Sequence, residues 1–326
     1  MSRPVLVAPD AFKGTFSAAK VAGAIGRGLE RAGLEADLCP VADGGEGTLA
    51  VLVTALGGET AGARARDPLG REVAAGFALI EDGGTAIVEV AEASGFSRVA
   101  PEERDVMAAT THGTGELILA AVDAGAAVVL VAAGGSATSD GGAGAIEAIQ
   151  ASGGLRGTKL VVLCDVRIPW EEAPARFGPQ KGATPEQVRE LEARLRAQAK
   201  TLPKDPTGVP MTGAAGGLSG GLWAAFDAAL EPGAPFVLGT LETDTRMRAA
   251  RAVIVGEGRL DRTSLQGKVT GELATRARQA GVPCHAIVGQ NALDLMDGRI
   301  LDLQEIVQAT TLDELERAGE ALAEKL

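Results

Sequence analysis

Aromatic and basic side chains are scarce in this chain of 326 residues, and their scarcity excludes several classes of function. Phe, Trp and Tyr together make up 3% of the sequence, too few for the aromatic platforms on which nucleic acid bases stack. Lys and Arg number 31 against 43 Asp and Glu, which gives a net charge of -12. Such a charge argues against a nucleic acid surface and against a polybasic membrane contact. We therefore expect neither nucleic acid nor a membrane among the partners.

Cysteine and histidine are also rare. Cys39, Cys164 and Cys284 lie far apart, in or beside apolar runs, which predicts buried free thiols. No cysteine pair has zinc-ligand spacing, so zinc chemistry is disfavoured, and His285 in an apolar strand is interpreted as a hydrogen-bonded core residue. No apolar stretch approaches the roughly 18 residues of a membrane-spanning helix, and no secretory segment precedes the first strand. We expect a cytoplasmic protein.

Strands and helices alternate along most of the sequence, which predicts parallel sheets with helices on their faces. Three strand-like runs at 59–65, 72–80 and 85–90 have turn sequences between them and no helix, which predicts an antiparallel meander. We therefore predict an α/β fold with two domains. Residues 1–58 and about 241–326 form a Rossmann-like or flavodoxin-like domain with a parallel sheet. Residues of about 59–240 form an inserted α/β domain with an antiparallel or mixed sheet, although the strand 126–133 and its loop could belong to the first domain.

Further elements are predicted in the second half of the chain. The segment 167–210 is rich in proline and contains an exposed charged helix at 185–200, which is typical of a surface cover or a mobile lid. An apolar helix is expected at 218–230. A strand at 252–255 is expected to end in a loop at 256–268.

The glycine-rich run 134–144 follows an apolar strand and precedes a helix. Glycine lets the backbone approach a ligand closely, and the start of a helix presents unpaired N–H groups to an anion. A carboxylate in this run would repel a bare phosphate, and a bound Mg²⁺ would remove that conflict. A capped tight turn is the alternative, and neither a P-loop nor a G-x-G-x-x-G signature is present. We predict that nucleotide phosphates bind here, through Gly134, Gly135, Ser136, Thr138, Asp140, Gly141 and Gly142.

Carboxylates and lysines gather directly after the predicted strands. Ligands bind at the carboxyl edge of open α/β sheets, so we expect these loops to share one edge and to form a composite site. Carboxylates with lysines suit Mg²⁺-assisted phosphoryl transfer, in which an aspartate accepts a hydroxyl proton and lysine neutralises the transferring oxygens. Helix capping and solvated ion pairs are the alternatives for individual members. The residues are Asp10, Lys13, Asp43, Glu46, Asp140, Asp165, Lys181, Glu257, Asp261 and Lys268.

Ordered motifs along nearly the whole chain resemble those of the glycerate kinase family, the bacterial type that includes glycerate 2-kinases. The chain departs from the family pattern at Ser139, at Ile168-Pro169-Trp170 and at Thr270, where Asn, Asn-Pro-Leu and Pro are usual. The matching motifs are 9–14 (PDAFKG), 42–48 (ADGGEGT), 67–70 (DPLG), 113–118 (GTGELI), 134–144, 164–166 (CDV), 177–184 (FGPQKGAT), 213–218 (GAAGGL) and 256–261 (GEGRLD).

The resemblance implies ATP-dependent phosphorylation of D-glycerate to 2-phosphoglycerate, with ATP and Mg²⁺ bound, and two α/β domains that face across a cleft containing the active site. Three alternatives remain: a 3-phosphoglycerate-forming enzyme, a kinase of a related small hydroxy acid, and a non-catalytic anion sensor. The oligomeric state is open, a homodimer being one option.

Site roles follow as hypotheses. Asp140 and Asp165 are assigned to the metal. Lys13 and Lys268 neutralise the transferring group or the substrate carboxylate. The base could be Asp43, Asp165 or Asp261. The catalytic set is Lys13, Asp43, Asp165 and Asp261, and the substrate-binding set is Asp10, Glu46, Lys181, Glu257 and Lys268.

Overall fold

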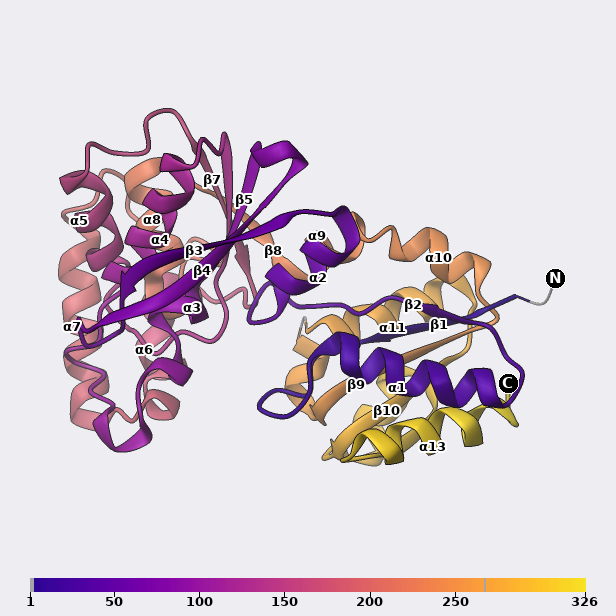
Figure 1. The fold of residues 1–326 in the computed structure, drawn as a ribbon. Coiled ribbons are helices and arrows are strands. Elements are labelled where there is room, and N and C mark those ends of the chain that lie inside the picture. Colours follow the sequence, from indigo (N-terminus) through magenta and orange to yellow (C-terminus); the bar gives the residue numbers. More distant parts are fainter. Residues whose placement is uncertain (1–2, 267) are drawn as a thin grey trace. The chain divides into compact units, whose positions relative to one another are not determined.

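The computed structural model describes residues 3–266 and 268–326 and shows an α/β protein with two compact units, each built on its own sheet (Figure 1). The terminal unit comprises the chain up to Asp43 together with Ala234–Leu326, and the inserted unit comprises Gly44–Gly233. One sheet is parallel and the other is mixed, which confirms the predicted fold class.

The five-stranded sheet of the terminal unit is parallel throughout, in the order β11-β10-β9-β1-β2. Counted along the chain within this sheet, the order is that of flavodoxin-like folds, whose ligands bind where the strand order reverses. That point lies between β1 and β9, with Pro9 opposite Gly256. The strands are β1 (Val5–Pro9), β2 (Ala36–Leu38), β9 (Ala252–Leu260), β10 (Cys284–Asn291) and β11 (Leu303–Gln308).

Two amphipathic helices of the terminal unit, α1 (Ala18–Arg31) and α13 (Leu312–Ala323), lie side by side (Figure 1). The Ser17 hydroxyl caps α1, and a capping box formed by Thr311 and Glu314 begins α13. Their apolar stripes pack in one core with β1, β9 and β10. The remaining helices here are α10 (Thr243–Ala249), α11 (Val269–Ala280) and α12 (Leu295–Leu301), while α9 (Gly233–Thr240) begins at the unit boundary.

The six-stranded sheet of the inserted unit has the order β3-β4-β5-β6-β7-β8. Its first three strands are antiparallel, as the predicted meander requires, and the pairs from β5 to β8 are parallel. The parallel strands therefore end at a common carboxyl edge. The strands are β3 (Glu59–Arg66), β4 (Glu72–Ile80), β5 (Thr85–Glu89), β6 (Val128–Ala132), β7 (Lys159–Cys164) and β8 (Ala229–Pro232).

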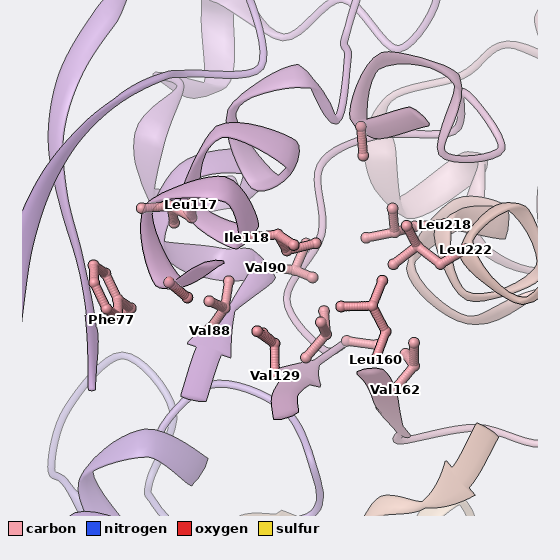
Figure 2. Packing of buried hydrophobic residues seen from close by; sticks show 14 of the residues in the cluster. Phe77, Val88, Val90, Leu117, Ile118, Val129, Leu160, Val162, Leu218 and Leu222 are labelled. Carbon is pink, nitrogen blue, oxygen red and sulfur yellow. The ribbon is translucent and has the colours of Figure 1, made fainter. Parts of the chain in front are cut away.

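Aliphatic side chains from strands and helices fill the core of the inserted unit. Figure 2 shows Leu117 and Ile118 of α4 and Leu218 of α8 packed with strand residues such as Val129 and Leu160. Strand residues two apart, such as Leu160 and Val162, face the same side, as the pleat dictates. The helices are α2 (Thr48–Leu56), α3 (Val90–Ser94), α4 (His112–Asp123), α5 (Ala143–Ala151), α6 (Ala173–Phe177), α7 (Pro185–Ala199) and α8 (Leu218–Phe226).

The segment 167–210 forms a small core of its own. Trp170 is fully buried against Leu195 and Ala199 of α7, and its indole N–H donates to the Leu195 carbonyl at 3.0 Å. Most of α7 is exposed, so the segment covers the surface as predicted. Its mobility stays a prediction.

The unit boundaries lie elsewhere than the predicted ones at 58 and 240. Helix α2 packs on β4 and β5, so the inserted unit begins at Gly44 and not after α2. At the other end, the inserted unit closes with β8, and the terminal unit resumes at Ala234. Strand β6 pairs with β5 and β7, which places the strand 126–133 in the inserted unit.

Two predicted elements are wrong in detail. The helix expected at 218–230 ends at Phe226, because Asp227 takes a left-handed conformation and the next residues pair with β7 as β8. The loop expected at 256–268 is strand up to Leu260, because β9 continues its pairing with β10 beyond Glu257. Gly267 of that loop lies outside the described residues.

The three cysteines are buried and free, as predicted. His285 is buried in β10, as predicted for a core residue, and its Nδ1 has no hydrogen-bond partner in the described part of the chain. Within residues 3–266 and 268–326, the helices are too short or too polar to cross a membrane.

The contact between α1 and α13 depends on Gly28. A Cβ at this position would lie 2.0 Å from the carbonyl oxygen of Glu316, which is backbone and cannot move aside alone. We expect Gly28→Ala to lower the free energy of unfolding by about 1–3 kcal/mol or more, as overpacking does. Urea unfolding measures the change.

Gly23 on the same helix provides the matched control. A Cβ there would lie 3.6 Å from an Arg27 side-chain atom, an ordinary contact. We expect Gly23→Ala to stabilise the protein by about 0.5–1 kcal/mol, because alanine favours the helix. Equal effects of the two substitutions would contradict the packing of α1 on α13.

Candidate functional site

A pocket of about 400 Å³ lies in the terminal unit, where β1 and β9 present their carboxyl ends. This is the point at which the strand order reverses, so the pocket lies where flavodoxin-like folds bind ligands. The structure brings together here five of the residues predicted from the sequence: Asp10, Lys13, Asp43, Glu257 and Lys268.

Charge in this pocket is arranged by depth. The acids Asp10, Asp43 and Glu257 are buried, whereas the side chains of Lys13 and Lys268 are 55% and 36% exposed. Lys13 Nζ lies 3.4 Å from Asp43 Oδ2, and Lys268 Nζ lies 3.5 Å from Glu257 Oε2. These separations are longer than a strong charge-assisted hydrogen bond, so both lysines can still contact an anion in the pocket.

Burial changes the protonation of the acids. Loss of solvent, reinforced by the Asp43 charge, raises the pKa of Asp10 to about 8, against the opposing effects of Lys13 and of the Ala11 N–H. Asp10 Oδ1 accepts that N–H at 2.7 Å. Burial also raises the pKa of Glu257, although Lys268 opposes it, and Glu257 Oε1 is buried without a hydrogen-bond partner among the described residues.

Asp261, predicted to be catalytic, is not among the described residues that line the pocket. Its Oδ1 accepts hydrogen bonds from the backbone and hydroxyl of Thr263 at 2.9 and 2.5 Å. Burial would raise the pKa of Asp261, but these hydrogen bonds hold it below its usual value. Its geometry is that of a turn-forming residue.

The inserted unit has a second polar edge, at the ends of β6 and β7. A Cβ on Gly134 would lie 2.5 Å from Gly45 Cα and 3.3 Å from Asp165 Oδ2. Glu46 lies next to Gly135, since a Cβ there would be 3.9 Å from Glu46 Oε2. Glycine at 134 therefore allows the loop 44–47 and the Asp165 carboxylate to meet.

The carboxylate of Asp140 accepts hydrogen bonds from the main chain around it. Its Oδ2 accepts from Thr111 N and Thr111 Oγ1, both at 2.9 Å, and from Gly144 N at 3.1 Å. Its Oδ1 accepts from Gly142 N at 3.2 Å. The chain's own carboxylate thus occupies the N-terminus of α5, and a phosphate would have to bind nearer Gly134 and Gly135.

The hydroxyls of the glycine-rich loop also serve the loop itself. Ser136 Oγ and Thr138 Oγ1 are buried and hydrogen-bonded to each other at 2.9 Å, and Thr138 N donates to Ser136 Oγ. Ser139 Oγ is buried and lacks a hydrogen-bond partner in the described chain. Ser136 and Thr138 therefore shape the turn and do not face solvent.

Lys181 is a buried cation beside this loop. Its Nζ donates to the Thr138 carbonyl oxygen. Burial lowers the pKa of Lys181 to about 8, although Asp140 and Asp165 favour its charged form. The predicted Lys181 therefore belongs to the same polar cluster as Asp165 and the glycine-rich loop.

Glu89 is a buried acid at this edge of the inserted unit that the sequence analysis missed. It ends β5, and its Oε1 accepts the N–H groups of Gly47 and Leu49 at 2.9 and 2.7 Å, which caps α2. Burial raises the pKa of Glu89 to about 7 against these hydrogen bonds, and Glu92 and Glu46 raise it further. A single acid at the end of an apolar strand was the available signal.

The predicted sharing of one sheet edge by all these loops is wrong, because the strands belong to two sheets. Asp10, Lys13, Asp43, Glu257 and Lys268 lie in the terminal unit, while the glycine-rich loop, Glu46, Asp165 and Lys181 lie in the inserted unit. Each unit therefore has its own candidate site.

The acidic groups suit Mg²⁺ only when a ligand completes the coordination. Among residues 3–266 and 268–326, no three His, Cys, Asp or Glu side chains are arranged to hold a metal ion. Mg²⁺ commonly uses one or two carboxylates together with substrate phosphates and water. Asp165 lies beside Gly134, and it is assigned to the metal in place of Asp140, whose oxygens hold the N-terminus of α5 through hydrogen bonds.

Comparisons with known proteins agree on one family. The sequence profile of the glycerate kinase family matches residues 5–154 and 145–326. The chain is 38% identical to a glycerate kinase of Halalkalibacterium halodurans over 87% of this chain and 85% of that protein. It is 36% identical to the glycerate 2-kinase of Escherichia coli over 87% and 84% of the two chains. A crystal structure from Salmonella typhimurium, described as glycerate kinase 2, superposes with a TM-score of 0.82 at 32% identity and covers 100% of this chain and 98% of that one.

The buried Glu89 carboxyl predicts a pH-dependent effect on stability. Because its pKa rises from 4.5 to about 7 on folding, ionisation destabilises the folded protein as the pH increases through that range. In Glu89→Gln the side-chain oxygen can still accept both N–H bonds, but no charge forms. We expect this variant to gain stability over the natural chain between pH 5 and pH 8, by on the order of 2 kcal/mol. Urea unfolding at both pH values measures it.

Glu89→Ala is the control for the capping role. It removes the acceptor, so we expect it to be less stable than the natural chain at both pH values by about 1–3 kcal/mol. A stability difference between Glu89→Gln and the natural chain that does not change with pH would show that Glu89 does not titrate in this range.

Proposed function

Because the chain belongs to the glycerate kinase family, we propose that it transfers the terminal phosphoryl group of ATP to the 2-hydroxyl of D-glycerate. The family and the enzyme class predicted from the motifs are confirmed by the comparisons. The proposed 2-phosphoglycerate product is supported by the similarity to a protein named glycerate 2-kinase. The observation that carries the proposal is the pocket of the terminal unit, in which buried acids and exposed cations meet.

Glycerate binding is assigned to this pocket. A small hydroxy acid needs a cation for its carboxylate and an acceptor for its hydroxyl proton, and the pocket offers both. Lys13 and Lys268 supply positive charge at its exposed side, and Glu257 Oε1 supplies a buried acceptor that has no hydrogen-bond partner among the described residues. The volume of about 400 Å³ is ample for such a ligand.

Asp43 is the preferred base among the three aspartates that the sequence left open. It lines the pocket and lies beside Lys13, whereas Asp261 does not line the pocket and Asp165 belongs to the inserted unit. A carboxylate that accepts the hydroxyl proton and a lysine that neutralises the transferring oxygens are the parts that phosphoryl transfer requires.

ATP phosphates are assigned to the loop of the inserted unit, at Gly134 and Gly135. Glycine at these positions lets the loop 44–47 and the Asp165 carboxylate pack closely against the backbone that would bind the phosphates. Asp165 would hold Mg²⁺ together with phosphate oxygens, and the metal would supply neutralisation of phosphate charge. Lys181 adds a buried cation to the same cluster, and Asp140 keeps the loop in shape through its backbone hydrogen bonds.

Direct assay tests the proposal. Release of ADP with D-glycerate, and NMR of the product, should show phosphorylation at the 2-hydroxyl. A 3-phosphorylated product would correct the regiochemistry. Turnover with tartronate or lactate but not glycerate would change the substrate. Ligand binding without turnover of ATP would show that the protein is a non-catalytic anion sensor.

Lys13 provides a test of the catalytic pocket. If Lys13 contacts charge that develops in the transition state, Lys13→Ala should lower kcat/KM at least about a hundredfold. The control is Lys20→Ala, which removes an exposed lysine of the same unit on α1 and should leave the kinetics unchanged. Near-normal kinetics of Lys13→Ala in a folded protein would remove Lys13 from the site.

The raised pKa of Asp10 predicts that substrate binding depends on pH. With a pKa of about 8, Asp10 is protonated below that pH and becomes a buried anion above it, where it repels a bound carboxylate. We expect the KM for D-glycerate to rise above pH 8, by up to about tenfold per pH unit. In Asp10→Asn, which stays neutral, this rise should disappear. A rise that persists in the variant would assign the titration to another group.

A further inference from the structure

Arg259 lies in the same pocket but was not among the residues predicted from the sequence. It belongs to the carboxyl-terminal part of β9 and lines the pocket two residues after Glu257. Its side chain is 61% exposed. Two neighbours orient the guanidinium group: Nε lies 3.3 Å from Asp261 Oδ2, and Nη1 donates to Gln290 Oε1 at 3.3 Å.

The guanidinium differs from the two lysines in what it can recognise. Lys13 and Lys268 are point charges, and each already faces a carboxylate of the protein across 3.4 or 3.5 Å. Arginine presents a planar fork of N–H donors that matches both oxygens of a carboxylate. Nη2 makes no hydrogen bond within the described residues, so the fork has donors left for a ligand.

The charge of the pocket also fits a monoanion. Three acids and three cations line it, and burial keeps Asp10 protonated at neutral pH. The balance is then one positive charge, which a substrate with a single carboxylate would neutralise. Without Arg259 that positive surplus is lost.

We propose that Arg259 binds the carboxylate of the substrate and thereby selects hydroxy acids over uncharged alcohols. The inference rests on the proposed function and adds the residue that determines its substrate class. Gln290 and Asp261 position the guanidinium. The hydrogen bonds of the Asp261 turn hold the Asp261 carboxylate in place beside Arg259.

The experiment compares two substrates, D-glycerate and its uncharged methyl ester, with ATP held at saturation. In Arg259→Gln we expect the KM for D-glycerate to rise at least about tenfold, as for loss of a charge-assisted hydrogen bond, with kcat changed far less. The KM for ATP and the activity with the ester should stay near those of the natural chain. The ratio of kcat/KM for acid over ester should therefore fall.

Two further variants complete the design. Arg248→Gln removes an exposed arginine of the same unit outside the pocket lining, and it should leave both substrates unaffected. Arg259→Lys keeps the charge without the fork and should lie between the natural chain and Arg259→Gln. It also serves if Arg259→Gln fails to fold, which circular dichroism would show.

The outcomes separate the two proposals. If the natural chain does not phosphorylate D-glycerate, the proposed function fails. If it does, but the folded Arg259 variants keep the normal KM and acid-to-ester ratio, only the role of Arg259 is overturned. A fall in kcat alone, with KM unchanged, would also overturn it, because ground-state recognition of the carboxylate must appear in KM.

Discussion

Burying a carboxylate costs free energy, and the way each acid in this fold is compensated determines whether it can meet a ligand. Asp140 accepts main-chain N–H groups at the start of α5, and Glu89 accepts those at the start of α2, which fixes both helix N-termini in place. Asp10 Oδ1 accepts the N–H of Ala11, whereas Glu257 Oε1 accepts no hydrogen bond among the described residues. Asp140 and Glu89 therefore maintain structure, whereas Asp10 and Glu257 line a pocket and can accept further hydrogen bonds.

The same compensation limits where phosphate can bind. Helix N-termini attract anions through unpaired N–H groups, but at α2 and α5 those groups already serve Glu89 and Asp140. A second anion at either terminus would face a carboxylate at hydrogen-bonding distance. Phosphate is therefore assigned to the backbone of Gly134 and Gly135, upstream of the cap, where the lack of a Cβ lets the loop 44–47 pack closely.

The sequence predicted the types of most elements because strand and helix periodicity alternates clearly, and its motifs identified the family. It placed Asp10, Lys13, Asp43, Glu257 and Lys268 at strand ends, and the structure gathers them. It could not tell that β6 and β1 belong to different sheets, since both are short apolar runs followed by polar loops. It also missed Glu89, in a predicted strand, and Arg259, in a predicted loop, because only their tertiary neighbours, Gly47 and Gln290, indicate their roles.

A protein with a net charge of -12 repels anionic ligands at long range, and salt screens that repulsion beyond roughly 10 Å. Binding of a small acid must therefore depend on charge within the pocket. The terminal unit meets this requirement without an excess of basic residues: it places as many acids as cations around the pocket but buries the acids. Desolvation then keeps a proton on Asp10 and so removes one negative charge from the pocket. The effect on the pocket's net charge is the same as that of adding a cation. Local burial thus produces the positive potential that the composition of the chain lacks.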